Sequence, residues 1–342
     1  MSSPSVAPDA KPARSDSAML EVQDLVKDFP IRSGLRRGTR GRVSAVAGVS
    51  FTVPRGQTFA LVGESGCGKS TTARLVLRLV PATSGTVHVD GVDVLRAAPA
   101  DLRRLRSRMQ IVYQDPYASL NPRLSAGAIV ADPLRVHGRF KADGPARVRA
   151  LFERVGLDPV DVHRYPHEFS GGQRQRIGIA RALALEPDLL VLDEPVSALD
   201  VSIQAGVLNL LDELQRTRNL TYLLIAHDLA AVRQLADLVG VMYLGKLVER
   251  GPADRLYNEP QHPYTQALLS AVPVPDPPVE RRRRRILLEG DLPSPTAPPS
   301  GCRFRTRCWR AQPICAEREP PLESHTREHR VACFFPGPDP AR

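Results

Sequence analysis

Two short stretches of the sequence carry residue types that bind phosphate. The first, GESGCGKS, runs from Gly63 to Ser70 between the apolar segment TFALV and the helix-like segment TTARLVLRLV. Its pattern supplies glycines that let the backbone curl around phosphate oxygens, a lysine that reaches the β- and γ-phosphates, and a hydroxyl for Mg²⁺. We therefore predict that Lys69 and Ser70 bind a magnesium nucleoside triphosphate.

The second stretch is HEFSGGQRQRIGIARAL, residues 167–183. It places Ser-Gly-Gly at the head of a predicted helix, where free backbone N–H groups and the positive end of the helix dipole favour an anion. It begins about a hundred residues after the first stretch. One chain thus contains two predicted phosphate-binding turns, although a single nucleotide site needs only one.

Polar residues follow several apolar runs. Asp193 and Glu194 close LLVLDE, His227 ends TYLLIAH, and Gln114 follows IVY. If these runs are parallel strands, their ends meet beside Gly63 at one edge of a sheet, where open α/β folds bind ligands. Asp193 suits the outer coordination sphere of Mg²⁺, and Glu194 is placed to polarise a water for attack on the γ-phosphate. We expect Gln114 to sense the nucleotide.

The surrounding segments predict a mixed α/β fold. VSAVAGVSFTV, the turn PRGQ and TFALVG indicate a hairpin that leads into a buried strand, and GTVHVDGVDV carries a hairpin turn at Asp90 and Gly91. Residues 116–168 are more helical and are interrupted by prolines. DLLVLDE, TYLLIAH and LVGVMY alternate with helical segments, which favours parallel strands joined by crossover helices.

Length and composition indicate a cytosolic protein. The 342 residues allow one large core domain and an appendage. No apolar run approaches the roughly 18–20 residues needed to cross a bilayer, and the N-terminal segment lacks the apolar centre of a signal peptide. The net charge of +10 fits nucleic acid, anionic lipid or a polyanionic ligand. The basic runs at 31–42 and 281–285 lack helical or strand period, so we expect solvated loops, with contacts to a lipid surface or to a partner as the alternatives.

The composition changes near residue 275, and four of the five cysteines follow. Their spacing is C-x₅-C-x₆-C-x₁₇-C, without the tight pairs of structural zinc sites. Because a reducing cytosol disfavours disulfides, iron–sulfur ligation, zinc ligation and free thiols in a small core remain. The wide intervals suit an iron–sulfur cluster. The four candidate ligands are Cys302, Cys308, Cys315 and Cys333.

The order of these motifs resembles the nucleotide-binding subunit of an ATP-binding cassette (ABC) transporter. The resemblance spans residues 19–272 and rests on GESGCGKS, Gln114, SGGQ, LLVLDE, SALD and His227. It implies an α/β, RecA-like P-loop NTPase fold: a mixed sheet core, an antiparallel β part and a helical subdomain over about 116–185. A small cysteine-containing C-terminal extension would follow this cassette.

The resemblance also implies why there are two phosphate-binding turns. Two cassettes associate head to tail, so that each ATP lies between one phosphate loop and the Ser-Gly-Gly of the other chain. ATP would then bind the closed pair better than the open monomer, and hydrolysis would reopen it. Glu194 and His227 would be catalytic, Phe29 would stack on adenine, and Gln114 would join Ser70 and Asp193 around Mg²⁺. The other implied nucleotide-binding residues are Gly63, Glu64, Ser65, Gly66, Cys67, Gly68, Lys69, Thr71, Ser170, Gly171, Gly172, Gln173 and Asp200.

The C-terminal sequence resembles one branch of this family. YNEPQHPYTQALLSAVP, LPSPTAPPSGCRFRTRC and HRVACFF are similar to the extension of cassettes that serve dipeptide and oligopeptide importers. The resemblance implies a peripheral ATPase on the cytoplasmic face of the membrane, with two transmembrane permease subunits, a related second ATP-binding subunit and an extracytoplasmic solute-binding protein. The transported solute could instead be nickel, glutathione or another small molecule, since members of this branch also handle such solutes. Some relatives with this tail resemble iron–sulfur proteins, which implies a 4Fe–4S cluster.

These inferences divide the chain into four parts: a disordered segment 1–18, a cassette 19–272, a Pro/Arg-rich linker 273–300 and a Cys-rich extension 301–342. A soluble ABC ATPase acting on nucleic acid is the main alternative, but the chain has one set of motifs and no sustained heptad segment. We therefore expect no nucleic-acid partner. A small-molecule kinase would leave SGGQ and SALD unexplained.

Overall fold

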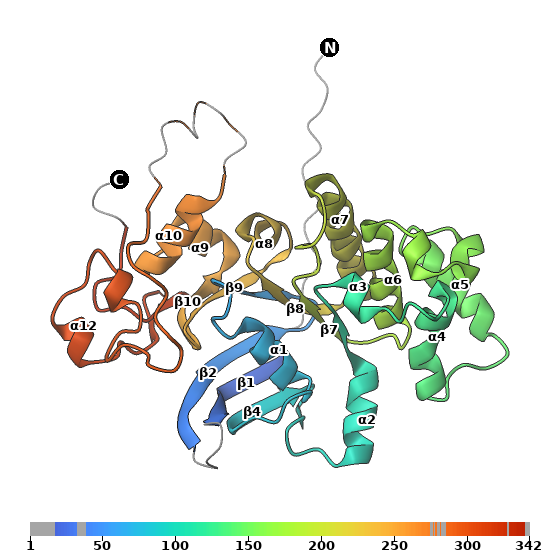
Figure 1. Cartoon of the computed structure of the whole chain (residues 1–342), viewed down its shortest axis with the longest axis horizontal. Helices are drawn as coiled ribbons and strands as arrows, with labels where there is room; N and C mark the ends of the chain where they lie inside the picture. Colours follow the sequence, from blue (N-terminus) through green and yellow to red (C-terminus); the bar gives the residue numbers. More distant parts are fainter. Residues whose placement is uncertain are drawn as a thin grey trace.

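The computed structural model describes residues 18–32, 39–273, 276, 278, 281, 285–326 and 328–338. Most of the segment expected to be disordered, and parts of both basic runs, lie outside these ranges. The loop expected over residues 31–42 is wrong at its two ends, because residues 31–32 pair with residues 39–41 as antiparallel strands. Figure 1 shows an antiparallel sheet below a central sheet, a helical part on one side, and the C-terminal extension on the other. Among the described residues, no helix combines the length and the apolar character that crossing a bilayer requires.

The central sheet has eight strands in the order β11-β12-β10-β9-β3-β8-β7-β6. Its strands are β3 (Thr58–Val62), β6 (Met109–Val112), β7 (Leu189–Asp193), β8 (Thr221–Ala226), β9 (Leu238–Tyr243), β10 (Lys246–Pro252), β11 (Glu323–Ser324) and β12 (Arg330–Val331). Strands β6, β7, β8, β3 and β9 are parallel, as expected, and β10 to β12 are antiparallel. All residues of β3, β7 and β8 are buried, which explains their uninterrupted apolar runs.

The smaller sheet has the order β2-β1-β4-β5. Its strands are β1 (Ala18–Arg32), β2 (Thr39–Pro54), β4 (Ser84–Val89) and β5 (Val92–Asp93). The predicted turn at Asp90 and Gly91 joins β4 to β5, with φ of +50° and +75°. The hairpin expected through PRGQ is wrong, because this turn carries the chain from β2 in one sheet to β3 in the other.

Helices cover the central sheet and form the helical part (Figure 1). Those that pack near the sheet are α1 (Lys69–Val76), α2 (Pro99–Arg108), α7 (Val201–Arg218), α8 (Leu229–Leu235), α9 (Ala253–Asn258) and α10 (Pro263–Ala271). The helical part contains α3 (Pro116–Ser119), α4 (Ala126–Val136), α5 (Gly144–Arg154), η1 (Pro159–His163), η2 (Pro166–Glu168) and α6 (Gly171–Leu183).

The core is divided between the two faces of the central sheet. Along β3, Ala60 and Val62 belong to the cluster that continues into the helical part, while Phe59 and Leu61 belong to the cluster that includes residues of the antiparallel sheet. This alternation follows from the two-residue period of a strand. Strand β3, which leads into the phosphate loop, is therefore held from both sides.

The C-terminal extension adds to the central sheet. It contains η3 (Arg305–Arg307), α12 (Ile314–Glu317), β11 and β12. Strand β12 pairs with β10, which sets Val331 beside Glu249. Beneath this pairing the buried carboxylate of Glu249 lies 2.7 Å from His329 Nε2. The extension is thus joined to the core by strand pairing and by a buried polar contact.

Candidate nucleotide site

The phosphate loop, residues 63–70, connects β3 to α1. Gly63 and Gly68 have φ of +151° and +110°, and their backbones lie very close to neighbouring segments. A Cβ on Gly63 would lie 2.2 Å from the carbonyl oxygen of Met242, and one on Gly68 would lie 2.1 Å from that of Ala45. Glycine is therefore required at both positions by conformation and by space.

Lys69 fills the centre of this loop. Its side chain is nearly buried, and its Nζ donates hydrogen bonds to the carbonyl oxygens of Gly63 at 2.7 Å and Glu64 at 3.0 Å. The ammonium group is thus aimed into the space that the loop encloses. An anion entering this space would gain a charge-assisted hydrogen bond.

Ser70 and Asp193 meet beneath the loop. The Ser70 hydroxyl donates to Asp193 Oδ1 at 2.8 Å, and only 4% of the Asp193 surface is exposed. Burial raises the pKa of the Asp193 carboxyl, although the hydrogen bond from Ser70 opposes this shift. A hydroxyl and a carboxylate are oxygen ligands of the kind that Mg²⁺ prefers, so the two residues fit this ion.

Glu194 lies between two polar side chains at the same edge of the sheet. Gln114 Nε2 donates to Glu194 Oε2 at 2.7 Å, and His227 Nδ1 lies 3.1 Å from the same oxygen. The three residues follow β6, β7 and β8, whose register aligns their carboxyl ends. Glu194 has a φ of +48°, a conformation that turns the chain sharply after β7. The structure therefore brings together the three strand-end side chains.

A cleft of about 460 Å³ opens over these groups. This volume falls in the range of small-molecule sites. The cleft is lined by Ala45, Ser65, Gly66, Gly68, Lys69, Ser70, Thr71, Gln114, Glu194 and His227. All of these residues except Ala45 are predicted from the sequence to bind the nucleotide or to take part in its hydrolysis.

The second predicted phosphate-binding turn, residues 170–172, does not line this cleft. Ser170 caps α6: its hydroxyl accepts from the Gln173 N–H at 3.3 Å, and Gln173 Oε1 accepts from the Ser170 N–H at 2.9 Å. A Cβ on Gly172 would lie 2.4 Å from Ile203, so glycine allows α6 to pack against α7. Asp200 is the residue before α7. The two predicted phosphate-binding turns therefore do not line the same cleft within one chain.

Phe29 lies on β1 and is also outside the cleft lining. Its side chain is 39% exposed, and the Lys27 ammonium group lies 4.9 Å from the centre of the ring. One face of an aromatic ring at the surface is thus already covered by a cation.

Some contacts to the loop have no signal in the sequence. The Glu64 N–H donates to the Tyr264 hydroxyl at 2.8 Å, and Arg307 Nη1 donates to Glu64 Oε2 at 2.8 Å. These partners are 200 and 243 residues away along the chain. Neither Tyr264 nor Arg307 lies in a sequence motif or a periodic pattern that would predict a contact with the phosphate loop.

The four C-terminal cysteines line one small cavity beside Phe304 and Phe335, with a volume of about 10 Å³. This is about the space of one water molecule. Burial raises the pKa of Cys302 and Cys333 to about 11, which keeps both thiols protonated at neutral pH. Among the described residues, no three His, Cys, Asp or Glu side chains are grouped so that they could hold a metal. The arrangement therefore does not support the predicted 4Fe–4S cluster, and none of the cysteines forms a disulfide.

Comparison with known proteins assigns the chain to a family. The ABC transporter family matches residues 46–197, and the oligopeptide/dipeptide transporter C-terminal region matches residues 248–315. The oligopeptide transport ATP-binding protein AppF of Bacillus subtilis is 52% identical over 325 residues, covering 94% of this chain and 99% of the relative. The corresponding OppF of Salmonella typhimurium is 53% identical over 320 residues, covering 92% and 96%.

A solved structure gives the same assignment for the fold. The dimeric ATP-binding cassette MJ0796, in a post-hydrolysis state with ADP and phosphate, superposes with a TM-score of 0.61 at 25% identity. The match covers 69% of this chain and 99% of that one. Because the sequence relatives match along nearly their whole length at about half identity, this chain belongs to the ATP-binding subunits of ABC transporters and is an ATPase.

Proposed function

We propose that this chain energises the uptake of peptides through a membrane importer, by ATP-driven closure of a pair of cassettes. The names of its relatives and the matching C-terminal region support peptides as the solute. Glu194 lies between Gln114 and His227 at the edge of the cleft, and this position is the main support for its proposed role in ATP hydrolysis.

In this mechanism the loop binds the triphosphate and Lys69 contacts the β- and γ-phosphates. Ser70, Asp193 and Gln114 would hold Mg²⁺, which neutralises phosphate charge when it is bound. Glu194 accepts the proton of the attacking water, and this water's oxygen forms the new bond to the γ-phosphorus as the bond to ADP breaks. His227 contacts the same carboxylate and maintains its orientation.

The second part of the site comes from another cassette. Ser170 and the N–H groups of Gly171 and Gly172 would bind the γ-phosphate of an ATP held in the cleft of the partner chain. Two observations support this arrangement: these residues lie outside the cleft of their own chain, and the solved relative is dimeric. ATP would then favour the closed pair because it contacts both chains only in that state. We infer that the partner is a related second subunit.

The remaining predicted residues lie around this shared site. Phe29 would stack on the adenine through the ring face that Lys27 leaves uncovered. Gln173, which already supports Ser170, would help to orient the second turn. Asp200 would contact the partner chain near its phosphate loop.

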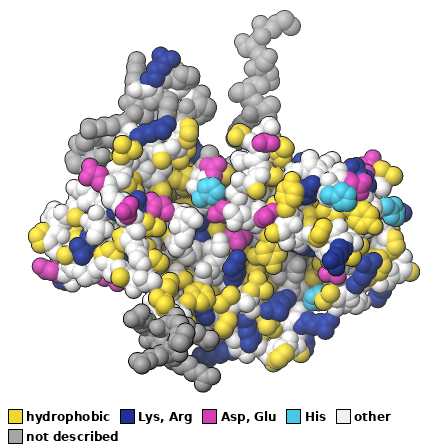
Figure 2. Space-filling model, in the orientation of Figure 1, with side chains coloured by type: hydrophobic (Ala, Val, Ile, Leu, Met, Phe, Trp, Pro, Cys, Tyr) yellow, Lys and Arg dark blue, Asp and Glu magenta, His cyan; other side chains and the backbone are white. Residues whose placement is uncertain are grey.

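We infer that the surface around α3 docks on the two permease subunits at the cytoplasmic face of the membrane. Tyr113, Tyr117 and Leu124 are exposed by 39%, 65% and 37% although they are large and apolar. Figure 2 shows hydrophobic side chains gathered on this face, over α3 and the neighbouring helical part. Exposed apolar surface of this kind is typical of protein interfaces. A solute-binding protein outside the membrane would deliver the solute to the permease.

Solute uptake by cells tests this proposal. Deletion of the gene should abolish uptake of labelled peptides, and uptake should return with the wild-type gene but not with Glu194→Gln. Loss of nickel or glutathione uptake, with peptide uptake intact, would contradict the peptide assignment and favour those solutes. Salt-dependent binding of the purified protein to DNA or RNA would instead favour the nucleic-acid alternative.

A further inference from the structure

We propose that the cysteine-flanked segment 302–308 of the C-terminal extension positions the phosphate loop for ATP, with Arg307 acting through Glu64. This inference goes beyond transport and needs only that the loop binds ATP. The segment contains Arg303, Phe304 and Arg307. Arg307 contacts the loop itself, Phe304 packs on a residue that contacts the loop, and Arg303 contacts the turn between β9 and β10, which also contacts the loop.

The contact between Arg307 and Glu64 is partly buried. Arg307 Nη1 lies 2.8 Å from Glu64 Oε2, and the two side chains are only 10% and 27% exposed. Burial alone would lower the pKa of the Arg307 guanidinium, but its interactions with Glu64 and Tyr243 together outweigh this effect and raise the pKa. An ion pair shielded from water in this way is stronger than one at an open surface.

Glu64 transmits this contact to Lys69. Its backbone N–H is held by the Tyr264 hydroxyl at 2.8 Å, and its carbonyl oxygen accepts from Lys69 Nζ at 3.0 Å. The Tyr264 ring packs against Phe304 with ring centres 5.4 Å apart. The extension therefore contacts the Glu64 side chain directly through Arg307 and supports the Glu64 backbone indirectly, through the packing of Phe304 on Tyr264.

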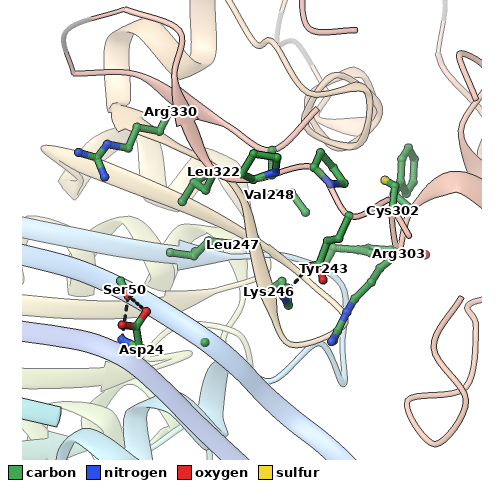
Figure 3. Close-up of a pocket in the computed structure, with 16 residues that line it drawn as sticks. Asp24, Ser50, Tyr243, Lys246, Leu247, Val248, Cys302, Arg303, Leu322 and Arg330 are labelled. Atoms are coloured by element: carbon green, nitrogen blue, oxygen red, sulfur yellow. Dashed lines mark hydrogen bonds and ion pairs between the residues drawn. The ribbon is translucent and has the colours of Figure 1, made fainter. Parts of the chain in front are cut away.

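The same segment supports the other end of the loop. Arg303 donates a hydrogen bond to the carbonyl oxygen of Leu244, at the turn between β9 and β10. In that turn the Gly245 N–H donates to the carbonyl oxygen of Cys67 at 2.9 Å. Figure 3 shows Cys302 and Arg303 on the extension beside Tyr243 and this turn, at one end of a cleft of about 490 Å³.

These contacts matter because glycine makes the loop intrinsically mobile. Gly63, Gly66 and Gly68 all have positive φ, and an unsupported loop would lose conformational entropy when it closes around phosphate. Contacts that fix the loop before ATP arrives reduce this cost and increase affinity. The expected consequence of losing Arg307 is weaker ATP binding rather than a general loss of folding.

The test uses the full-length protein with Arg307→Gln, Glu64→Gln and the double variant. The dissociation constant for Mg-ATP, kcat and the melting temperature are measured for each. We expect Arg307→Gln to raise the dissociation constant roughly 5- to 20-fold with a smaller change in kcat, and the double variant to bind no more weakly than the worse single variant. Arg307→Lys keeps the positive charge, so its dissociation constant should lie between those of wild type and Arg307→Gln. If Arg307→Gln folds poorly, Arg307→Lys replaces it in the comparison.

Arg305→Gln is the matched control. Arg305 belongs to the same segment, but its guanidinium donates to the carbonyl and hydroxyl oxygens of Ser300. This variant should bind ATP within about twofold of wild type. Two results would overturn the proposal: ATP affinity of Arg307→Gln equal to that of Arg305→Gln, or an effect of Arg307→Gln that is undiminished in the Glu64→Gln background.

Discussion

The Ser70 hydroxyl donates a 2.8 Å hydrogen bond to the Asp193 carboxylate, across 123 residues of sequence. The pairing joins the start of α1 to the end of β7 and places beneath the phosphate loop two oxygen-bearing side chains that fit Mg²⁺. Because Asp193 is almost completely buried, its negative charge is costly until a cation arrives.

Asp193→Asn should weaken Mg²⁺-dependent ATP binding and stabilise the nucleotide-free protein. Burial raises the pKa of Asp193 in the folded state, so the ionised carboxylate opposes folding as the pH rises through that value. Near neutral pH, replacing it with a neutral isostere should raise the melting temperature of the nucleotide-free protein by about 1–3 °C. Calorimetry from pH 4 to pH 8 checks this: the advantage of the variant should grow with pH, and a constant or shrinking advantage would contradict it.

Glu194→Gln should separate hydrolysis from binding. Removal of a general base slows the chemical step by roughly 10²–10⁴-fold, whereas the amide keeps the size of the side chain and its contacts with Gln114 and His227. ATP affinity should therefore change little, and the closed pair should persist. Single-turnover hydrolysis measured beside ATP binding tests the assignment, and an unchanged rate would remove Glu194 from the role of base.

Lys69→Ala should instead reduce binding itself. The ammonium group lies within the loop, and each charge-assisted hydrogen bond that it makes with phosphate is worth about 1.5–3 kcal/mol. The dissociation constant for ATP should rise at least about tenfold. Lys141→Ala, which removes an exposed cation in the helical part, is the control and should bind normally. If affinity survived the loss of Lys69, the loop would not be the phosphate site.

Ser170→Arg should leave ATP binding by the isolated chain intact and prevent ATP-induced closure. Ser170 is not among the residues that line the cleft of its own chain, so a bulky cation there should not change the first contact with ATP. It would instead collide with the partner's nucleotide. Fluorescence titration and sedimentation, both in the Glu194→Gln background, measure the two effects separately. Loss of ATP binding at low protein concentration, where the chain is monomeric, would place Ser170 in its own chain's site.

The strand-end residues could be predicted because their signals are local. Gly63, Asp193 and His227 each follow a buried apolar run, and the register of parallel strands brings such ends together. The predicted hairpin between β2 and β3 is wrong because a local turn signal indicates that the chain bends but not which sheet the next strand joins.

The contacts of the extension could not be predicted in this way. Arg307 and Glu64 are far apart in sequence, and β12 is a strand of two residues, too short to show a period. Cysteine spacing identified which thiols gather around one cavity, but spacing does not determine where the sulfur atoms point. The predicted metal cluster therefore has no support in the arrangement of the described side chains, which cysteine spacing alone does not determine.

The shared nucleotide site is the central claim, and the concentration dependence of ATP hydrolysis tests it most directly. Specific activity and sedimentation should be measured together in saturating Mg-ATP, for this chain alone and with a paired cassette. Activity should rise in step with the fraction of paired chains and should be low for the monomer. A chain that remains monomeric and hydrolyses ATP at its full rate at every concentration would contradict the account.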